Sequence, residues 1–490
     1  MNGTDSHIAR VKQKLAQVQA TWQTRPHEFG VQKHQFRMNP TLSEDTLLAF
    51  ETRHGIRLPE DYRAFLRNVG NGGAGPYYGI LPLEQWASGP DELDDEALSR
   101  SCPLSEHLPR TAEWEQMLPP GVENPYQGTI TICSQGCTYY VLLVVSGPAR
   151  GRVVYMDQEG QPPFFLREPD FLSWYERWLD ETIGGYDLTW FGFRMGGSEA
   201  DLLRILYDSH IPSSTRSDAL GALTKFPQLE AATPAVLAGL QDADADVRKS
   251  AALVVAHFSI AEAGPLIRRL VTDADPTVRK SALQALVKLP HVPWSVVQQM
   301  LQDPDTDVGE AAWRALHNAQ RLTIEDILPM LSSDDLRFRR HAAYSFKSIP
   351  LDHALDVLLH CLQDPDPDVR RYSVQSLAAH RSRQSVPMLT ALLATEKETL
   401  VLGNIIRALT EINDRGAVPA LIDVTRHPFA GVRYEAARAL GALGDRRAIP
   451  ALTLLCDDVV RPEERDATGG ARRWPDRVCD QARRSLQSLE

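Results

Sequence analysis

Apolar side chains recur at one fixed interval through the C-terminal half of the chain. Every copy of the pattern centres on an anchor, an apolar residue that arginine usually follows, and successive anchors lie 30 to 32 positions apart. The anchors are Val247, Val278, Val308, Phe338, Val369, Leu400 and Val432. A period of this length predicts an array of similar structural units, each stacked on the next.

Two helices are predicted in each unit. The residues four and eight positions beyond an anchor are apolar or small, as at Ser373 and Leu377 after Val369, and this spacing places them on one helical face. Another apolar stretch precedes the anchor and often begins with proline, which a first helical turn tolerates. These prolines are Pro265, Pro387, Pro419 and Pro450. Neither helix can bury its apolar face alone, so we expect a right-handed α-solenoid.

The units resemble HEAT repeats of the short kind, roughly 30 residues long, that many bacterial proteins carry. We assign the all-α solenoid to residues 199–490, with a degenerate first unit near residues 215–219, seven clear or moderate units, and a last unit at Val478. The polar insertion at residues 460–477 is predicted to protrude as a loop.

Charged residues flank the anchors in a regular order. Arginine follows most anchors and aspartate stands three positions before them, at Arg216, Arg248, Arg279, Arg339, Arg370 and Arg433, and at Asp244, Asp275, Asp305, Asp335 and Asp366. An arginine row could bind nucleic acid. The resemblance implies instead an internal ladder, in which aspartate caps the second helix and arginine reaches the neighbouring turn. Gly309, Val401 and Cys479 depart from this pattern and predict gaps in the ladder.

Residues two and six positions beyond the anchors are better candidates for a binding surface, because they fall off the buried stripe. Aromatic and arginine side chains among them are types enriched in protein interfaces. The candidates are Lys249, Lys280, Arg340, Tyr344, Arg371 and Tyr434. The alternative is an ordinary solvated helix face.

The N-terminal half shows a different pattern. Its first part, residues 1–40, contains an amphipathic helix over residues 7–22. A second helix is predicted to start at a capping box, Thr41–Glu44, and to end at Gly55. A third helix begins at Pro59. Apolar runs predict strands at 129–133, 139–145 and 151–155, and a strand-like run at 77–81, and an aromatic helix follows at 171–179.

One series of residues in this half resembles the SUKH superfamily. The series consists of Glu51, Gly55, Leu58-Pro59, Tyr62, Phe65-Leu66 and Asn71-Gly72-Gly73, with the family's spacing throughout. The resemblance covers residues 41–183 and implies an α+β domain, an antiparallel sheet with helices. Residues 86–127 are longer and more acidic than the family pattern requires.

The four glycines between Gly70 and Gly75 raise the question of a phosphate-binding loop. A phosphate loop lies between a strand and the start of a helix, where backbone amides point at the anion. Here the glycines follow the carboxyl end of a helix, whose partial negative charge repels phosphate. We therefore interpret the loop as a turn that needs positive φ angles.

Residues 184–198 join the two halves. Glycine pairs stand at both ends, but Trp190, Phe191 and Phe193 lie between them, and a free linker would not carry three large aromatic side chains. We expect this segment to dock and to fix the N-terminal domain against the first repeats.

Charge and motifs narrow the classes of function. The net charge is −12; residues 1–195 hold 17 Lys and Arg against 25 Asp and Glu, which gives −8 and leaves −4 for the remainder. An acidic N-terminal half disfavours nucleic acid or an anionic membrane as partner and favours a basic protein. The start of the sequence shows no signal peptide and no apolar run is long enough to span a bilayer, so we expect a cytoplasmic protein.

The sequence gives no indication of an enzyme, and we expect no cofactor and no metal. Neither a G-x-S-x-G nor an H-E-x-x-H motif occurs, and the six cysteines form no clusters; zinc at Cys133 and Cys137 remains a weak alternative to two ordinary thiols. A HEAT-like deoxyhypusine hydroxylase needs paired His-Glu dipeptides to hold two irons, whereas His27-Glu28 is the single such dipeptide here.

The resemblance to SUKH proteins implies a function. Bacterial members are mostly immunity proteins that bind and neutralise toxins, commonly nucleases, and fungal relatives regulate cell-wall assembly through protein interactions. We therefore expect a protein partner, foremost a basic toxin domain; the alternative is a housekeeping scaffold or regulatory adaptor for endogenous partners. The acidic residues Asp91, Glu92, Asp94, Asp95 and Glu96 are further binding candidates, against the alternative of a solvated loop.

Neutralising these five acidic residues together should slow association with a basic partner and flatten the salt dependence of the association rate, because the charges steer the encounter. Surface plasmon resonance at two salt concentrations measures both effects. An association rate equal to that of the wild type in low salt would show that the run is only a solvated loop.

Overall fold

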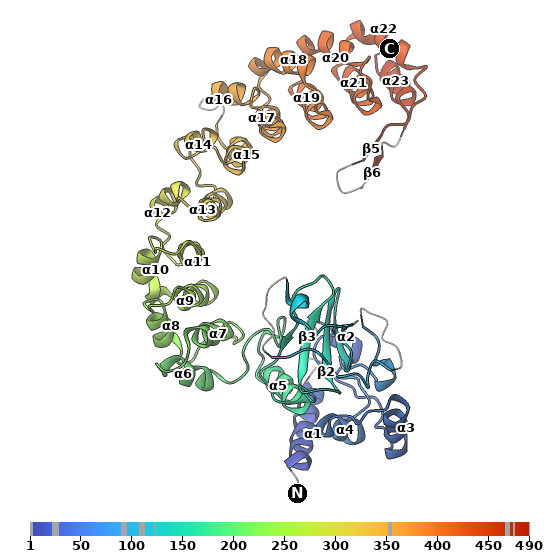
Figure 1. Ribbon diagram of the computed structural model, residues 1–490. Coiled ribbons are helices and arrows are strands. Elements are labelled where there is room, and N and C mark those ends of the chain that lie inside the picture. Colours follow the sequence, from blue (N-terminus) through green and yellow to red (C-terminus); the bar gives the residue numbers. More distant parts are fainter. Residues whose placement is uncertain are drawn as a thin grey trace. The chain divides into compact units, whose positions relative to one another are not determined.

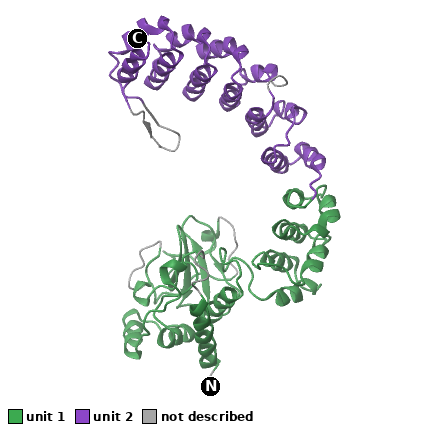
Figure 2. Ribbon diagram, turned by 180° about the vertical axis from the view of Figure 1, so that it is seen from behind, with its two compact units in different colours: residues 1–290 green, residues 291–490 purple. Residues whose placement is uncertain are grey.

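The computed structural model describes residues 3–21, 29–89, 96–106, 113–122, 124–350, 355–465, 471–473 and 476–489 (Figure 1). The chain forms two compact units, residues 1–290 and 291–490 (Figure 2). Unit 1 contains an α+β domain and the first helix pairs of the array, and unit 2 contains the remaining pairs. The fold class matches the one expected, and the expected boundary at residues 198–199 lies inside unit 1.

A four-stranded antiparallel meander organises the N-terminal domain. Its strands are β1 (Thr129–Gly136), β2 (Tyr139–Val144), β3 (Val153–Asp157) and β4 (Phe164–Phe165), paired in that order. Alternate residues serve opposite faces of the sheet: Val141 and Tyr155 belong to one hydrophobic cluster, and Leu142 belongs to another. Both faces are therefore buried.

Helices cover one face and an irregular segment covers the other. The helices are α1 (Gly3–Thr21), α2 (Val31–His34), α3 (Glu44–His54), α4 (Glu60–Asn68) and α5 (Phe171–Ile183). On the opposite face, Cys102, Leu104 and Trp114 pack against Leu142 and its neighbours. The long segment between the glycine loop and β1 thus supplies, in its described parts, a second core.

The residues that carry the family resemblance have structural roles. The buried Glu51 carboxylate accepts hydrogen bonds from the backbone N–H of Leu58 (2.9 Å) and from the Arg63 guanidinium (3.2 Å). In the glycine loop, Gly73 exchanges two 2.8 Å backbone hydrogen bonds with Ile80. A Cβ at Gly73 would lie 2.4 Å from the Arg37 carbonyl oxygen, so only glycine fits there. The loop is a turn at the edge of the sheet.

Two local predictions for this domain are wrong. The N-cap of α3 is Ser43, which accepts from the Thr46 N–H, rather than Thr41. The reason is that the Leu42 N–H bonds to the Leu66 carbonyl and keeps the preceding residues outside the helix. The strand expected at residues 77–81 contributes only an isolated bridge at Ile80 on either side.

The repeat array consists of helix pairs. In unit 1 they are α6 (Glu199–Tyr207) with α7 (Ser213–Leu223), α8 (Thr233–Gly239) with α9 (Ala245–Phe258), and α10 (Gly264–Leu270) with α11 (Pro276–Leu286). In unit 2 they are α12 (Trp294–Gln299) with α13 (Thr306–Asn318), α14 (Ile324–Leu331) with α15 (Leu336–Ser345), α16 (Leu355–Cys361) with α17 (Pro367–Ala379), α18 (Val386–Thr395) with α19 (Thr399–Ile412), α20 (Val418–Val424) with α21 (Ala430–Leu443), and α22 (Ile449–Leu455) with α23 (Val478–Gln487). The second helices line the inner side of unit 2 (Figure 1).

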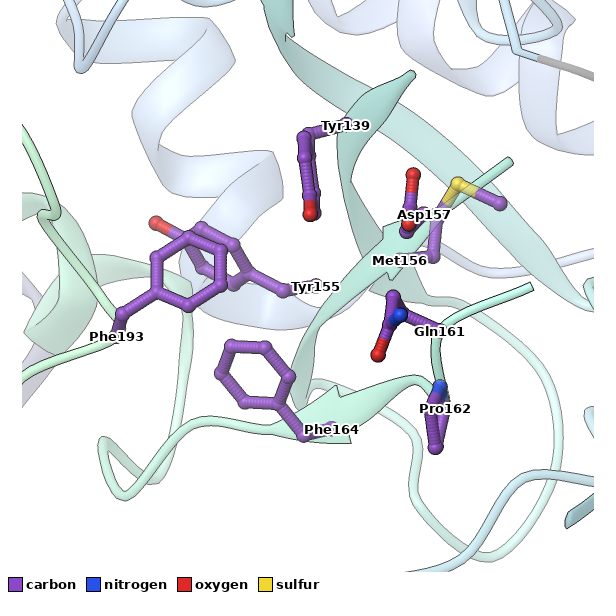
Figure 3. A pocket seen from close by; sticks show the side chains of 8 residues that line it. All are labelled: Tyr139, Tyr155, Met156, Asp157, Gln161, Pro162, Phe164 and Phe193. Atoms are coloured by element: carbon purple, nitrogen blue, oxygen red, sulfur yellow. The ribbon is translucent and has the colours of Figure 1, made fainter. Parts of the chain in front are cut away.

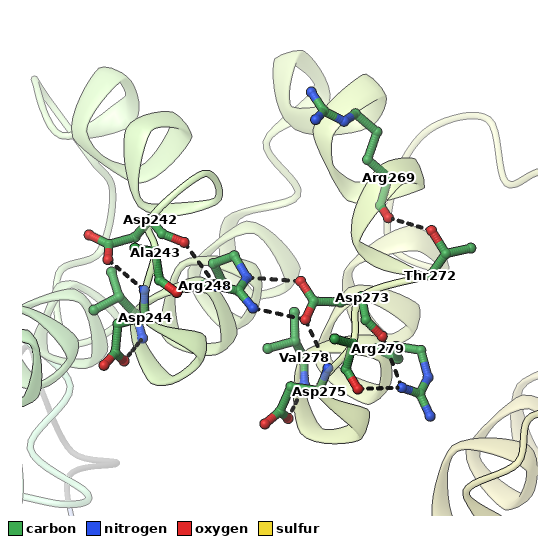
Figure 4. A network of polar contacts seen from close by, with 12 residues as sticks. Asp242, Ala243, Asp244, Arg248, Arg269, Thr272, Asp273, Asp275, Val278 and Arg279 are labelled. Atoms are coloured by element: carbon green, nitrogen blue, oxygen red, sulfur yellow. Dashed lines mark hydrogen bonds and ion pairs between the residues drawn. The ribbon is translucent and has the colours of Figure 1, made fainter.

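The predicted ladder of aspartate and arginine is confirmed. Figure 4 shows one step: Arg248 donates to both carboxylate oxygens of Asp273 (2.8 and 2.9 Å) and to the carbonyls of Asp242 and Ala243. The Asp244 side chain caps α9 through the backbone N–H groups of Asp246 and Val247. The same ion pair recurs at Arg216–Asp242, Arg339–Asp364, Arg370–Glu396 and Arg433–Asp458. The arginines that follow the anchors are therefore occupied within the array.

One anchor differs by one residue from the prediction. Leu400 is 56% exposed, whereas Val401 is 1% exposed and is the third residue of its helix, as the other anchors are. The hydrophobic stripe of α19 therefore begins at Val401, and Leu402, not Val401, takes the place of the ladder arginine. The N-cap Glu398 lies 32 residues after the N-cap Asp366 and takes the place of aspartate, and this one extra residue before α19 explains the error.

The insertion expected to protrude as a loop contains a short antiparallel pair. Its strands are β5 (Glu463–Arg465) and β6 (Ala471–Arg473). The backbone of Val478 then returns to the array through a hydrogen bond to the Val460 carbonyl (3.0 Å).

A buried cluster of charges joins the α+β domain to the first repeats. Lys225, which follows α7 and is 1% exposed, donates to Glu181 of α5 (2.8 Å) and to the Met195 carbonyl (2.9 Å). Arg177 donates to the same Glu181 (2.9 Å) and to the Arg194 carbonyl (2.5 Å). Three segments that are distant in sequence are thus held by one carboxylate.

The 184–198 segment packs into this junction. Phe191 is buried against Trp174, with ring centroids 6.1 Å apart, and the Arg177 guanidinium lies 5.0 Å from the centre of its ring. Trp190 remains half exposed and meets only the edge of Phe193 among the rings of the described residues. Two of the three linker aromatics therefore contact the domain directly.

Replacing Lys225 by methionine should lower the free energy of unfolding of unit 1 by about 3 kcal/mol, because Glu181 stays buried with one cation fewer. Urea unfolding of the full chain, followed by tryptophan fluorescence, measures this loss. Lys288→Met, at an exposed lysine of the same unit, is the matched control and should leave the unfolding midpoint unchanged. Equal midpoints for the two variants would contradict a stabilising role of the cluster.

Candidate protein-binding surface

Aromatic side chains form a continuous series along the second helices of unit 2. We call this series the aromatic row: Trp313 and His317 of α13, His341 and Tyr344 of α15, and Tyr372 of α17. Ring centroids of neighbours lie between 3.8 and 5.4 Å apart. Trp313 is buried and the other four are partly exposed. The row thus presents ring surface to solvent on a rigid support.

The closest contact in the row is between Trp313 and His341. Their rings stack at 3.8 Å with an interplanar angle of 16°. The indole N–H donates to the Ser345 hydroxyl (2.8 Å), which fixes the tryptophan. Burial lowers the pKa of His341, and the Glu310 carboxylate nearby opposes this effect. Burial also lowers the pKa of His317.

Cationic side chains border the row. Lys347 lies 4.5 Å from the centre of the Tyr344 ring, and Arg371 lies 4.2 Å from that of Tyr372. Arg371 also pairs with Asp368 (2.7 Å). This arrangement combines ring faces with cations that are already oriented, so a partner would meet side chains that lose little conformational freedom.

The other candidates from the sequence have different surroundings. Arg340 pairs with Asp366 (2.8 Å) and Asp368 (3.2 Å), so it supports the turn before α17 as much as it faces solvent. Lys249 pairs with Asp246 of its own helix, and Lys280 is half-buried on α11 in unit 1. Neither lysine lies in the unit that contains the row.

The expected exposure of Tyr434 is wrong. Its side chain is 6% exposed, because the last helix, α23, packs against α21 and covers the position two residues beyond the anchor. Of the candidates on the repeats, Tyr344 therefore belongs to the row and Arg371 borders it through its contact with Tyr372.

The acidic run lies almost entirely outside the described residues. Asp91, Glu92, Asp94 and Asp95 fall in the undescribed stretch 90–95. Glu96 is described; it is exposed and lies 3.8 Å from the Arg100 guanidinium. The steering role of the run stays a prediction.

Sequence reasoning missed Trp313, His317, His341 and Tyr372. The binding candidates were predicted two and six residues beyond each anchor, whereas His341 and Tyr372 lie three residues beyond theirs. A signal was present, because Trp313 and His341, and likewise Tyr344 and Tyr372, are 28 residues apart, just short of one repeat period.

Metal ions in proteins are held by groupings of several His, Cys, Asp or Glu side chains. No set of three or more such side chains among the described residues could hold a metal ion. Burial raises the pKa of the Cys133 thiol, and its sulfur contacts the Pro76 carbonyl. Among the described helices none has the length and apolar character needed to cross a bilayer.

Comparison with known families separates the same two regions. Residues 41–177 match the SMI1/KNR4 family (SUKH-1), and residues 233–293, 324–403 and 386–469 match HEAT repeats. The first of these matches includes the whole series from Glu51 to Gly73, which builds the helices and the turn of the domain.

Individual relatives match parts of the chain. A phycocyanobilin lyase subunit alpha from Nostoc sp. is 38% identical over 104 residues, 20% of this chain and 38% of that protein. Its counterpart from Picosynechococcus sp. is 33% identical over 113 residues, 21% of this chain and 42% of the relative. The chain thus spans about two fifths of the length of these relatives.

Two further similarities involve longer segments. Deoxyhypusine hydroxylase-B of Oryza sativa subsp. japonica is 25% identical over 269 residues, 52% of this chain and 84% of that enzyme. A crystal structure of importin beta superposes with a TM-score of 0.39 at 14% identity, over 59% of this chain and 46% of importin beta.

The pKa of His341 should lie below the usual value of about 6.5, and Trp313→Ala should raise it by exposing the imidazole to water. In the wild type the folded chain binds this proton less readily than the unfolded chain. The free energy of unfolding should therefore fall as the pH drops below about 6.5, where His341 of the unfolded chain becomes protonated. NMR titration of the histidine rings, assigned with His341→Gln, measures the pKa. Trp294→Ala is the control, and an equal shift in that variant would exclude the stack as the cause.

Proposed function

Since residues 41–177 match the SMI1/KNR4 family (SUKH-1) and HEAT-repeat matches follow them, we propose that the chain is a non-catalytic immunity protein of the bacterial cytoplasm. It binds a protein toxin and holds it inactive. The two families support a role in protein interaction, and the toxin as partner is the inference that the SUKH resemblance adds.

The aromatic row is the observation that supports protein binding most directly. Aromatic and arginine side chains are enriched among the residues that contribute most to binding at protein interfaces, and an aromatic ring buries a large area with only about two rotatable bonds. Here Tyr344 and Tyr372 stand on adjacent helices with rings 5.4 Å apart, and Arg371 is already stacked on one of them. A toxin surface that covers these rings would gain contact area at a small cost in entropy.

The similarity to deoxyhypusine hydroxylase-B fits shared helical repeats rather than a shared reaction. The dipeptide His27-Glu28 precedes the array and lies outside the described residues. Within the described part of the array no cluster could hold a metal. Binding without catalysis is therefore the function we propose.

Charge supports a basic toxin. Residues 1–195 carry a net charge of −8, and the chain as a whole carries −12. A toxin that acts on nucleic acid needs a basic surface, and opposite charges would speed its capture. Nucleic acid itself would be repelled.

Co-expression in a bacterial host tests the proposal. Cells that produce the toxin encoded beside this chain should survive when the chain is present and die when it is absent. Death of cells that contain both proteins in folded form would overturn the immunity function and favour the scaffold, whose gene needs no toxin beside it.

Tyr344→Ala should speed dissociation of the bound toxin roughly thirtyfold, the equivalent of about 2 kcal/mol, because a central ring of the interface is lost. Surface plasmon resonance measures the rate. Tyr207→Ala, at an exposed tyrosine of α6 in unit 1, is the matched control. Equal dissociation rates for the two variants would remove the row from the interface.

A further inference from the structure

A pocket of about 250 Å³ opens at one edge of the meander, outside the surface proposed above. The end of β3, the start of β2, β4 and the 184–198 segment all contribute to it. Its walls are made by Tyr139, Tyr155, Met156, Asp157, Gln161, Pro162, Phe164 and Phe193 (Figure 3). None of these residues belongs to the series that identifies the family.

The strand register explains why aromatic rings gather around the pocket. Tyr139 is the partner of Asp157 across β2 and β3, and Tyr155 is the partner of Phe164 across β3 and β4. Directly paired residues project from the same face of a sheet, and residues two apart on one strand share a face. Tyr139, Tyr155, Asp157 and Phe164 therefore project from the same face of the sheet and line the pocket together.

Phe193 completes the enclosure from outside the sheet. Its ring centroid lies 6.0 Å from Tyr139, 5.4 Å from Tyr155 and 5.2 Å from Phe164. Figure 3 shows Tyr139, Phe164 and Phe193 on three sides of the hollow and the Asp157 carboxylate beside Tyr139. Ring faces and edges at several angles provide surfaces on which a flat cation can stack.

The Asp157 carboxylate lacks a cationic partner among the described residues. The residue is 5% exposed, and the contact the structure gives it is the backbone N–H of Glu159, 3.3 Å from Oδ1. Burying a carboxylate costs free energy unless it is paired or well hydrogen-bonded. The other two buried carboxylates among the described residues of this domain, Glu51 and Glu181, both pair with arginine or lysine. Asp157 is as buried as these paired carboxylates, but no arginine or lysine of the described residues pairs with it.

We propose that this pocket binds the guanidinium group of an arginine side chain supplied by a partner protein. A guanidinium is planar and weakly hydrated, stacks on aromatic faces and donates two parallel hydrogen bonds to one carboxylate. The ammonium of lysine is a compact, strongly hydrated charge that uses the rings less well. The source of the arginine rests on the proposed protein-binding function, whereas capture of a guanidinium by the pocket does not.

The test uses the full chain with ¹³C-labelled methionine methyl groups, because Met156 stands in β3 between Tyr155 and Asp157 and its signal responds when either neighbour changes its surroundings. The probe is N-acetyl-arginine amide. Its addition should shift the Met156 signal saturably, with a dissociation constant on the order of millimolar, as suits one isolated side chain. N-acetyl-citrulline amide has nearly the same shape but no charge and should cause no shift. N-acetyl-lysine amide should bind at least about threefold more weakly.

Variants separate the carboxylate from the rings. Asp157→Asn keeps the shape and an acceptor for the Glu159 N–H, and should weaken probe binding at least about tenfold. Phe164→Leu should also weaken it, and it serves as the second variant if Asp157→Asn does not fold. Glu159→Gln, which removes an exposed charge near the mouth, is the matched control and should bind within about twofold of the wild type.

Three results would overturn the inference: no saturable shift with the arginine probe, an equal response to the citrulline probe, or unchanged binding by folded Asp157→Asn. Equal affinity for the lysine probe would overturn the preference for guanidinium. The outcome is independent of toxin neutralisation. Protection in co-expressing cells without probe binding refutes the pocket alone, and probe binding without protection refutes the immunity function alone.

Discussion

The carboxylate of Glu181 is the point on which the organisation of unit 1 depends. It accepts from Lys225 and from Arg177, and all three groups are almost completely buried. Burial lowers the pKa of Lys225, and the charge of Glu181 opposes this effect. A buried carboxylate with two buried cations is tolerable only when every member is in place. The α+β domain, the 184–198 segment and the first repeats are consequently held together as one cooperative set of contacts.

The repeat array also pairs its charges, but it tolerates the loss of a ladder residue better than the junction tolerates the loss of a charge. In the ladder pair of Arg248 with Asp273 the arginine side chain is 16% exposed, against 9% for Arg177 and 1% for Lys225, so the ladder cation is less completely removed from water than the cations of the junction. Gly309 shows this tolerance. A Cβ there would lie 2.6 Å from Phe338, the one anchor that is not aliphatic, so the missing arginine side chain leaves the space that the larger anchor fills. A departure from the pattern in one repeat is thus compensated by the next.

The sequence predicts those features that depend on spacing within the chain. The repeat period, the ladder, the prolines at helix starts and the glycine turn follow from distances of a few residues, or of one period, and all are found. Features that depend on contacts between distant segments could not be predicted from the sequence. Tyr434 is covered by a helix that comes after an insertion, Leu400 exchanges places with Val401, and nothing in the spacing of Lys225 and Glu181 indicates that they meet. The aromatic row lies between these two classes of feature. Its 28-residue interval is present in the sequence, but its meaning depends on the register of neighbouring helices, which the sequence does not give.

The junction and the Asp157 pocket are both built in part by the 184–198 segment, which couples their stabilities. Arg177 lies over Phe191 and donates to the Arg194 carbonyl, and these two residues flank the stretch that carries Phe193. Between them, Gly192 has a φ of 86°, and a Cβ there would lie 2.4 Å from the Tyr155 ring. Only glycine lets the segment approach closely enough for Phe193 to close the pocket wall. Contacts that hold the first repeats against the domain therefore also help to complete the pocket, and a guanidinium bound there would in turn stabilise the docked 184–198 segment.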